Sequence, residues 1–307
     1  MYPIIFEFPA WVPFMGGEAV TSFGVFMLFS FLTGGYLIRA EMARIGEDPD
    51  KAWDLVFMGV VGGILGAKIY YILLNYPRLA TDPAALILSR GGLVWYGGFI
   101  LATALVVWEI RRQKLPLPTM ADVVAPGLAM AYGVGRMGCF LVGDDWGVPT
   151  DSWVGIAFPK GYPATTVSNI EALGISVDPA LVEKYGQVLP VHPTQLYEVG
   201  ISTAVFFFLW KIRRHKHNAG WLFMLWLGFS GAERFLVEFL RAKDDRFFGV
   251  LTLAQIISLG IIGVGIYGMT KLGRLRPQPR TRCADHSSRL RLAVREAISP
   301  ESGRCFP

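Results

Sequence analysis

A single arginine, Arg136, stands inside a long apolar segment that runs from Met120 to Val142. A charge at the centre of a membrane helix costs about 3 kcal/mol or more, so such residues usually have a function. A second apolar segment carries Arg234 and Glu238, which share one face of a helix because they stand at positions i and i+4. Arginine makes planar, two-point contacts with phosphate and carboxylate groups. The two segments therefore predict a site for an anionic, phosphate-bearing ligand.

The composition is that of a polytopic membrane protein. Of the 307 residues, 53% are hydrophobic and only 17% are charged, whereas charged residues make up about a quarter of a soluble domain. A spanning helix needs about 20 mostly apolar residues. We therefore expect an all-α fold with about seven transmembrane helices, at residues 20–38, 54–74, 93–110, 120–142, 194–212, 219–240 and 251–269.

The basic residues predict the orientation in the membrane. They cluster after the first, third and fifth predicted helices and in the tail, and cytoplasmic loops carry such an excess of Lys and Arg. Lys and Arg are absent before Arg39, so the start lacks the positive region of a cleaved signal peptide. We expect an external N-terminus and a cytoplasmic C-terminus, although Arg241, Lys243 and Arg246 weaken the contrast.

Residues 1–271 are expected to form one membrane domain, which includes a small external head at 144–193. In this head, Asp178 and Pro179 before an apolar turn, with Gly186 after it, predict a short helix. Residues 153–158 alternate like a short strand. The basic tail at 272–307 is expected to be disordered or to lie along the anionic inner leaflet.

The ionisable residues gather at one depth. At about 1.5 Å per residue, Arg136 lies about 24 Å above Met120, in the outer third of its helix. The outer parts of other predicted helices contribute Lys68, Tyr96, Glu198, Glu233, Arg234 and Glu238. A pump or channel would spread such groups along a path through the membrane. The clustering predicts instead a site that faces the outer leaflet.

Several of these residues also have simpler interpretations. Arg136 and Lys68 could reach the headgroups without binding a substrate, and Arg234 could serve only to neutralise Glu238. Tyr96 could be an ordinary interfacial aromatic residue. The glycines could simply allow close helix packing, namely Gly62, Gly63, Gly66, Gly97 and Gly98.

Three motifs resemble those of the bacterial prolipoprotein diacylglyceryl transferases over about residues 18–270. They are Gly135-Arg-Met-Gly-x-Phe, His192-Pro-Thr-Gln-Leu-Tyr-Glu198 and Arg234-Phe-Leu-Val-Glu238. The resemblance implies a seven-helix enzyme of the bacterial plasma membrane. Such an enzyme moves the diacylglyceryl group of phosphatidylglycerol to the lipobox cysteine of a lipoprotein precursor at the outer leaflet and releases glycerol phosphate. Its partners would be phosphatidylglycerol, precursor signal peptides and membrane lipids, with no nucleic acid, and it would act as a monomer.

The resemblance also implies the site. The phosphate-contacting arginines of the family fall on Arg136 and Arg234, and its glutamate falls on Glu238. Asp144 takes the place of a second family glutamate, and Tyr96 takes the place of a histidine with an assigned catalytic role. Other family positions differ here, with Cys139 and Val142 in place of asparagines and Phe23 in place of a tyrosine.

The expected reaction is a displacement at the glycerol carbon next to the phosphate ester. The attacking thiol must lose its proton, and candidates for the base are Asp144, Glu238, Tyr96 and His192. Arg136 and Arg234 would stabilise the charge on the departing phosphate. No cofactor is expected. No metal site is expected either, because the three cysteines, Cys139, Cys283 and Cys305, are scattered.

Other classes of protein fit less well. Ser230, within Gly-Phe-Ser-Gly, suggests a membrane serine protease, but only His286 in the tail follows it as a base. A transporter would show internal repeats or paired broken helices, and the only sign of an interruption is Pro126. A diverged lipid-binding or lipid-transporting protein of the same fold remains the alternative, because of Tyr96 and Cys139.

Overall fold

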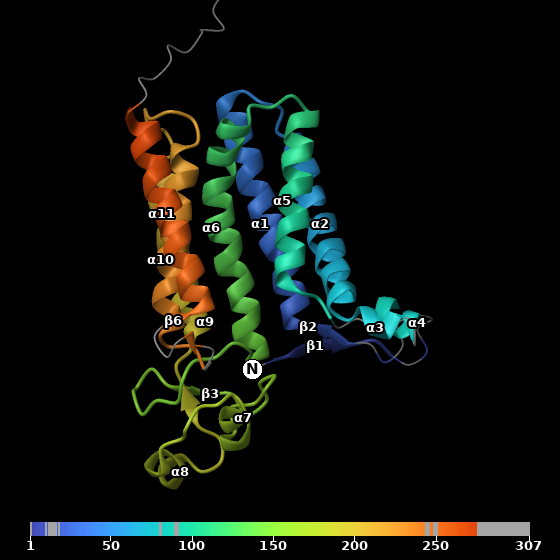
Figure 1. The fold of residues 1–307 in the computed structure, drawn as a ribbon, viewed down its shortest axis with the longest axis vertical. Coiled ribbons are helices and arrows are strands. Elements are labelled where there is room, and N and C mark those ends of the chain that lie inside the picture. The colour runs from blue at the N-terminus through green and yellow to red at the C-terminus, as the bar shows by residue number, and fades with distance from the viewer. Residues whose placement is uncertain are drawn as a thin grey trace, which may run out of the picture.

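The computed structural model describes residues 2–9, 11, 17, 19–79, 82–88, 92–242, 246–247 and 251–274. From residue 275 onward, the predicted tail lies outside this part of the chain. Long helices dominate the structure and run side by side (Figure 1). They are α1 (Ser22–Ile45), α2 (Lys51–Leu74), α5 (Trp95–Arg112), α6 (Leu117–Val142), α9 (Thr194–Ile212), α10 (Trp221–Glu238) and α11 (Leu253–Arg274).

Four of these helices are long and apolar enough to cross a membrane, namely α1, α2, α6 and α11. This agrees with the predicted helical membrane fold. The other three, α5, α9 and α10, have 18, 19 and 18 residues and occur where the sequence predicts helices. Their charged residues lower their hydropathy, and several of these residues belong to the candidate site described below.

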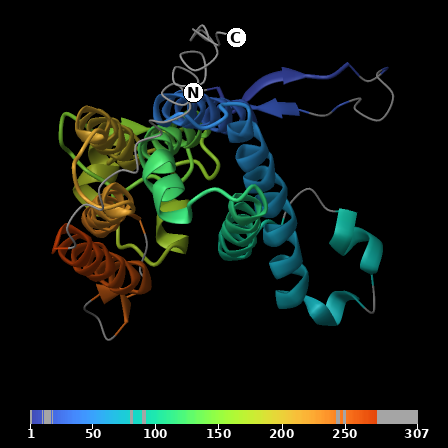
Figure 2. The same cartoon turned by 90° about the horizontal axis from the view of Figure 1, so that it is seen from above.

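The helices pack in pairs around α1 and α6. Helix α5 packs mainly against α2, whereas α9 and α10 pack against α6, and α11 packs against α10. Seen from above, α2 and α5 therefore lie on one side of α1 and α6, and α9 to α11 lie on the other side (Figure 2). Residues far apart in the sequence thus meet where α6, α9 and α10 come together.

Glycines bring α2 and α5 into close contact. A Cβ atom on Gly66 would lie 2.3 Å from the backbone oxygen of Gly97, and one on Gly62 would lie 2.6 Å from Cα of Ala102. Such closeness is typical of membrane helices that meet at small residues. The packing interpretation is confirmed for these positions and for Gly98, whereas a Cβ atom on Gly63 would meet open space.

The helix ends follow local caps rather than the limits of the apolar segments. Helix α1 extends beyond the predicted end at residue 38, because it stops only at Gly46, which has a φ of 84°. Helix α6 ends at Gly143, with a φ of 76°. Glycine adopts this left-handed conformation without the steric cost that a Cβ atom brings. At Gly143 it turns the chain directly after the site-bearing end of α6.

The segment between α6 and α9 folds beyond one end of the bundle (Figure 1). It contains β3 (Ile156–Ala157), α7 (Val167–Ala172), α8 (Pro179–Tyr185) and β4 (Pro190–Val191). The predicted short helix is confirmed as α8, which is capped by Asp178. The predicted strand at 153–158 is shorter than expected, because only two of its residues pair with β4. The segment has its own apolar core of Trp146, Phe158, Ile170, Leu189 and Val191.

Small elements that the sequence analysis did not predict complete the described part of the chain. They are β1 (Ile4–Glu7) and β2 (Ala19–Thr21), α3 (Tyr76–Leu79) and α4 (Pro83–Leu88), and β5 (Arg246–Phe247) and β6 (Leu251–Thr252). The β1–β2 hairpin, α3 and α4 lie at the same end of the bundle as the segment between α6 and α9, and the C-terminal end of α11 lies at the opposite end (Figure 1).

Candidate active site

A backbone anchor at the far end of the bundle sets α6 and α10 level with each other. The carboxylate of Asp122 in α6 accepts hydrogen bonds from the backbone N–H groups of Gly220 and Phe223, at 2.8 and 2.9 Å. Arg136 follows Asp122 by 14 residues (136 − 122), and Arg234 follows Gly220 by 14 residues (234 − 220). Both arginines therefore lie about 21 Å along their helices from the anchor. Equal spacing places the two guanidinium groups at the same level.

Glu198 of α9 lies between these two arginines. Its carboxylate forms an ion pair with Nη2 of Arg136, and its Oε1 atom lies 4.0 Å from Nη1 of Arg234. The same Oε1 atom accepts a hydrogen bond of 2.9 Å from the hydroxyl of Tyr132. The Glu198 side chain has no exposed surface. A fully buried carboxylate thus holds the two guanidinium groups close to each other.

The contacts continue into a closed ring of alternating charges. Arg234 pairs with Glu238 at 2.8 Å, and Glu238 lies 3.9 Å from Nε of Arg241. Arg241 pairs with Asp145, which returns to Arg136 at 2.9 Å. The predicted pairing of Arg234 with Glu238 is confirmed. We call this set the arginine–carboxylate ring, and its members are Arg136, Glu198, Arg234, Glu238, Arg241 and Asp145.

The ring still offers donors to a ligand. The Nε atom of Arg136 is buried and has no hydrogen-bond acceptor among the described residues. Buried donors without a partner are rare in proteins and point to a missing ligand or water. The Arg234 side chain is 31% exposed, whereas that of Arg136 is only 9% exposed. Arg234 is therefore accessible to an anion, whereas Arg136 lies deeper in the site.

Two adjacent carboxyl groups at the outer edge of the ring differ in their environment. Burial and the charge of Asp145 raise the pKa of Asp144 above its usual range. Burial would also raise the pKa of Asp145, but Arg241 and Arg136 outweigh burial and hold this pKa below its usual range. One carboxyl group is thus kept ionised by the arginines, and its neighbour is more ready to accept a proton.

Cys139 lies beside these carboxyl groups. Its sulfur accepts a hydrogen bond of 3.4 Å from Nη1 of Arg136. One ligand atom each from Cys139, Asp144 and Asp145 lie within 4.8 Å of one another, close enough for three metal ligands. However, both oxygens of Asp145 are already paired with arginines, and guanidinium charge opposes a cation. The two guanidinium groups that pair with Asp145 therefore disfavour a metal ion at these three residues.

The structure does not bring all of the predicted residues together. Arg136, Arg234 and Glu238 belong to the ring, and Asp144 adjoins it. Tyr96 lies on α5 and is 49% exposed, and its aromatic side chain packs against that of Trp95. No contact between Tyr96 and the ring is found among the described residues.

Two further sequence candidates also contact residues outside the ring. The Nδ1 atom of His192 lies 3.1 Å from the hydroxyl of Tyr197. Its carbonyl accepts from the N–H of Gly147 at 2.8 Å, which joins the chain after α6 to the start of α9. The ammonium group of Lys68 lies over the ring of Tyr71.

Sequence reasoning missed the roles of three residues. Arg241 stands three positions after Glu238, a spacing that allows contact on a helix, and this signal was available. Asp145 and Tyr132 gave no comparable signal. Their contacts depend on the turn at Gly143 and on the rotation of α6 toward α9.

Comparison with known proteins identifies the family. A profile described as prolipoprotein diacylglyceryl transferase matches residues 9–271. A phosphatidylglycerol–prolipoprotein diacylglyceryl transferase of Clostridium tetani is 29% identical over 278 residues, which cover 91% of this chain and 100% of the relative. Enzymes of the same name from Sodalis glossinidius and Vibrio vulnificus are 32% and 31% identical, and the matches cover 90% and 82% of this chain and 94% and 87% of those proteins. The chain therefore belongs to the prolipoprotein diacylglyceryl transferase family, a family of enzymes.

Proposed function

We propose that this protein transfers the diacylglyceryl group of phosphatidylglycerol to the lipobox cysteine of lipoprotein precursors. The similar enzymes are named for this lipid and this protein substrate. The observation that carries the proposal is the pair of arginines on either side of Glu198, where no described residue accepts from the buried Nε–H of Arg136. A phosphodiester supplies the anionic oxygens that such donors bind.

The proposed setting is the outer leaflet of a bacterial plasma membrane. All seven long helices would span the bilayer, with the N-terminus and the segment 144–193 outside and the C-terminus in the cytoplasm. The positions of basic residues in the sequence support this orientation. The ring then lies near the outer surface, where a precursor's lipobox cysteine emerges from the membrane.

In the proposed reaction, the cysteine thiolate attacks the glycerol carbon that carries the phosphate ester. A carbon–sulfur bond forms, the carbon–oxygen bond breaks, and glycerol phosphate leaves with its new negative charge on oxygen. Arg136 and Arg234 would stabilise this charge, since donors fixed in a dry site act more strongly than donors in water. Glu238 holds Arg234 in place from one helical turn away.

The thiol must also give up its proton. One candidate acceptor is Asp144, at the edge of the arginine–carboxylate ring, because burial and Asp145 raise its pKa. Tyr96 is separated from the ring in the described structure, which supports a role in lipid positioning rather than in proton transfer.

Complementation tests the proposal directly. A bacterium depleted of its own transferase should regain growth and lipoprotein modification when it makes this protein, and Arg136→Ala should fail at an equal protein level. The purified enzyme should label a lipobox peptide with radioactive diacylglyceryl from phosphatidylglycerol. Absence of transfer by folded wild-type protein, in cells and in vesicles, would refute the proposed activity.

A further inference from the structure

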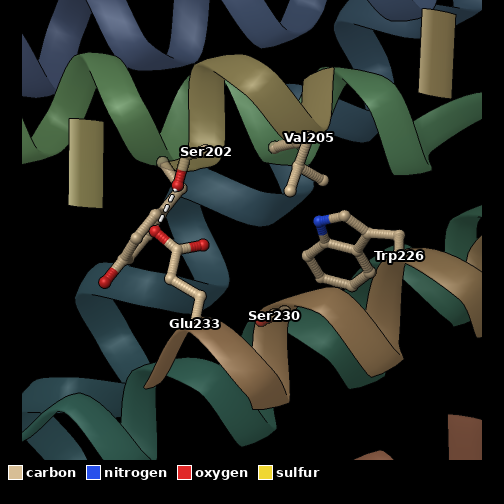
Figure 3. Close-up of a pocket in the computed structure, with 7 residues that line it drawn as sticks. Ser202, Val205, Trp226, Ser230 and Glu233 are labelled. Carbon is tan, nitrogen blue, oxygen red and sulfur yellow. Dashed lines mark hydrogen bonds between the residues drawn. The ribbon is translucent and has the colours of Figure 1, made fainter. Parts of the chain in front are cut away.

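A cavity lies between α6, α9 and α10, about one helical turn from the arginine–carboxylate ring toward the middle of the bundle. Its volume is about 60 Å³, and its polar lining comes from Tyr132, Ser202, Ser230 and Glu233, together with Trp226 (Figure 3). Tyr132 stands four residues before Arg136, and Ser202 stands four residues after Glu198, so both lie one turn from the ring. A water molecule needs about 10–15 Å³ of such space and two to four polar partners. This cavity has room for at least two waters.

Glu233 is the carboxyl group of this cavity, and it forms no ion pair with a described residue. Glu233 is 7% exposed, and the hydroxyl of Ser202 donates a hydrogen bond of 2.6 Å to its carboxylate. Among the described residues, no Lys, Arg or His nitrogen forms an ion pair with it, in contrast to Glu198 and Glu238. In Figure 3, the second carboxyl oxygen of Glu233 and the indole nitrogen of Trp226 point into the same space. A buried ionisable group of this kind in a membrane helix calls for a functional explanation.

Tyr132 connects this cavity to the ring. Its side chain lines the cavity, and its hydroxyl donates to Glu198 at 2.9 Å. Glu198 in turn contacts both arginines. Hydroxyl and carboxyl groups that are joined by water pass protons readily along such a chain. A route from the ring to Glu233 would therefore consist of Glu198, Tyr132 and water held in the cavity.

We propose that Glu233, acting through this route, receives the proton that the substrate thiol loses. The sulfur–hydrogen bond breaks and the proton joins the carboxylate of Glu198. The hydroxyl of Tyr132, which donates to Glu198 at rest, turns to give its own proton to water in the cavity and takes the proton from Glu198 in its place, and the water protonates Glu233. One thiol becomes a thiolate and one carboxylate becomes a carboxyl group, so charge and atoms balance. The proton returns along the same route to the departing glycerol phosphate.

The surroundings of Glu233 leave it suited to this task. The ionisable groups that face it are Tyr132 and Arg136 from α6 and Glu198 from α9, with Arg234 next to it in α10. The polar residues of α11 near this level, Gln255 and Ser258, do not titrate. Glu233 acts through Tyr132 and Glu198 and does not touch substrate, so we regard it as a positioning residue. This inference rests on the proposed transferase function.

The test combines kinetics with infrared spectroscopy on the full chain in lipid. In phosphatidylglycerol vesicles, Glu233→Gln should lower kcat by about 100-fold, the usual size of an acid–base effect. It should leave KM for the lipid unchanged and remove the limb of the pH–rate profile that follows ionisation of a carboxyl group. Glu233→Asp should restore most of this limb. Glu183→Gln, an exposed carboxylate on α8, is the matched control and should behave like wild type.

In the infrared spectrum of wild type, we expect a carboxyl band that titrates and whose proton exchanges with D₂O. Glu233→Gln should remove this band, and Tyr132→Phe should slow the exchange. An unchanged pH profile in Glu233→Gln, with the limb removed instead by Asp144→Asn, would overturn the proposal. So would a Glu233 band that does not exchange. If folded wild-type protein transfers no lipid, the proposed function fails, and the infrared arm still decides whether Glu233 exchanges protons through Tyr132.

Discussion

Arg136 and Glu198 form an ion pair that is buried on both sides, with 9% of the arginine side chain and none of the glutamate side chain exposed. Both charges have left water, so each depends on the other for stabilisation. Glu198 also approaches Arg234. This carboxylate therefore keeps two cations together in the bundle, where the proposed function needs them to bind the phosphate of the lipid.

The first prediction concerns Glu198. Glu198→Gln removes the fully buried partner of Arg136 and leaves that guanidinium paired only with the half-exposed Asp145, so it should destabilise the protein, by up to about 3 kcal/mol. Thermal unfolding in detergent, followed by tryptophan fluorescence, measures this loss. Glu183→Gln is the control on the surface and should unfold like wild type. Equal unfolding temperatures for Glu198→Gln and wild type would show that the pair does not stabilise the bundle.

The second prediction concerns the geometry of Arg136. Lysine keeps the charge but not the planar two-point contact, so Arg136→Lys should lose activity nearly as badly as Arg136→Ala. The loss of one donor to the developing charge costs about 2–4 kcal/mol, or roughly 30- to 1000-fold in rate. Diacylglyceryl transfer per folded protein is the measurement. Activity near that of wild type in Arg136→Lys would rule out the phosphate contact.

Part of the fold could be predicted from the sequence, because apolar length and glycine caps are local signals. The short helix α8 is an example, since Asp178, Pro179 and Gly186 define its two ends within one segment. The similar depth of Arg136 and Arg234 also follows from helix rise and from the predicted ends of their two segments. These features need no knowledge of how the helices pack.

The rest of the site depends on packing that the sequence does not reveal. The contact of Tyr132 with Glu198 requires a particular rotation of α6 against α9. The contact of Asp145 with both arginines requires the left-handed turn at Gly143. Tyr96 shows the reverse case. A motif match suggested that it joins the site, whereas α5 packs mainly against α2 and leaves Tyr96 outside the ring.

The third prediction concerns Tyr96. If its hydroxyl does not transfer the proton, Tyr96→Phe should lower turnover by less than about 100-fold, the usual lower bound for removal of a general acid or base. The arginine–carboxylate ring remains intact in this variant, so binding of phosphatidylglycerol should also remain. Complete loss of turnover with lipid binding retained would instead identify Tyr96 as the acid–base group.

The fourth prediction concerns the orientation in the membrane. In a protein with Cys283 and Cys305 replaced by serine, a cysteine at Ser152 should react with an impermeant maleimide in intact cells. A cysteine at Lys216 should react only after the membrane is opened. Both positions are exposed in the structure, so accessibility within the protein does not limit the labelling. The opposite pattern would place the arginine–carboxylate ring at the inner leaflet.

The last prediction concerns pH and Asp145. Burial alone would raise the pKa of Asp145, but Arg241 and Arg136 reverse this and hold it below the unfolded value. An ionised form that is favoured in the folded state stabilises the fold above the unfolded pKa, about 3.9, and this contribution is lost as pH falls through the lower folded pKa. Asp145→Asn should therefore lower the unfolding temperature at about pH 6–8, and the difference from wild type should shrink below about pH 4.

The size of this effect should be modest, because 43% of the Asp145 side chain is exposed and solvent weakens such pairs. Its pH dependence distinguishes an effect of charge from an effect of packing. Scanning calorimetry or fluorescence melts of both proteins across this range measure it. Asp151→Asn provides a control, since Lys184 and Tyr185 similarly lower the pKa of Asp151 through hydrogen bonds, but outside the ring. It should change stability without changing transfer. A constant difference between Asp145→Asn and wild type at every pH would mean that the side chain acts through packing, and that its charge does not hold Arg136 and Arg241 in place.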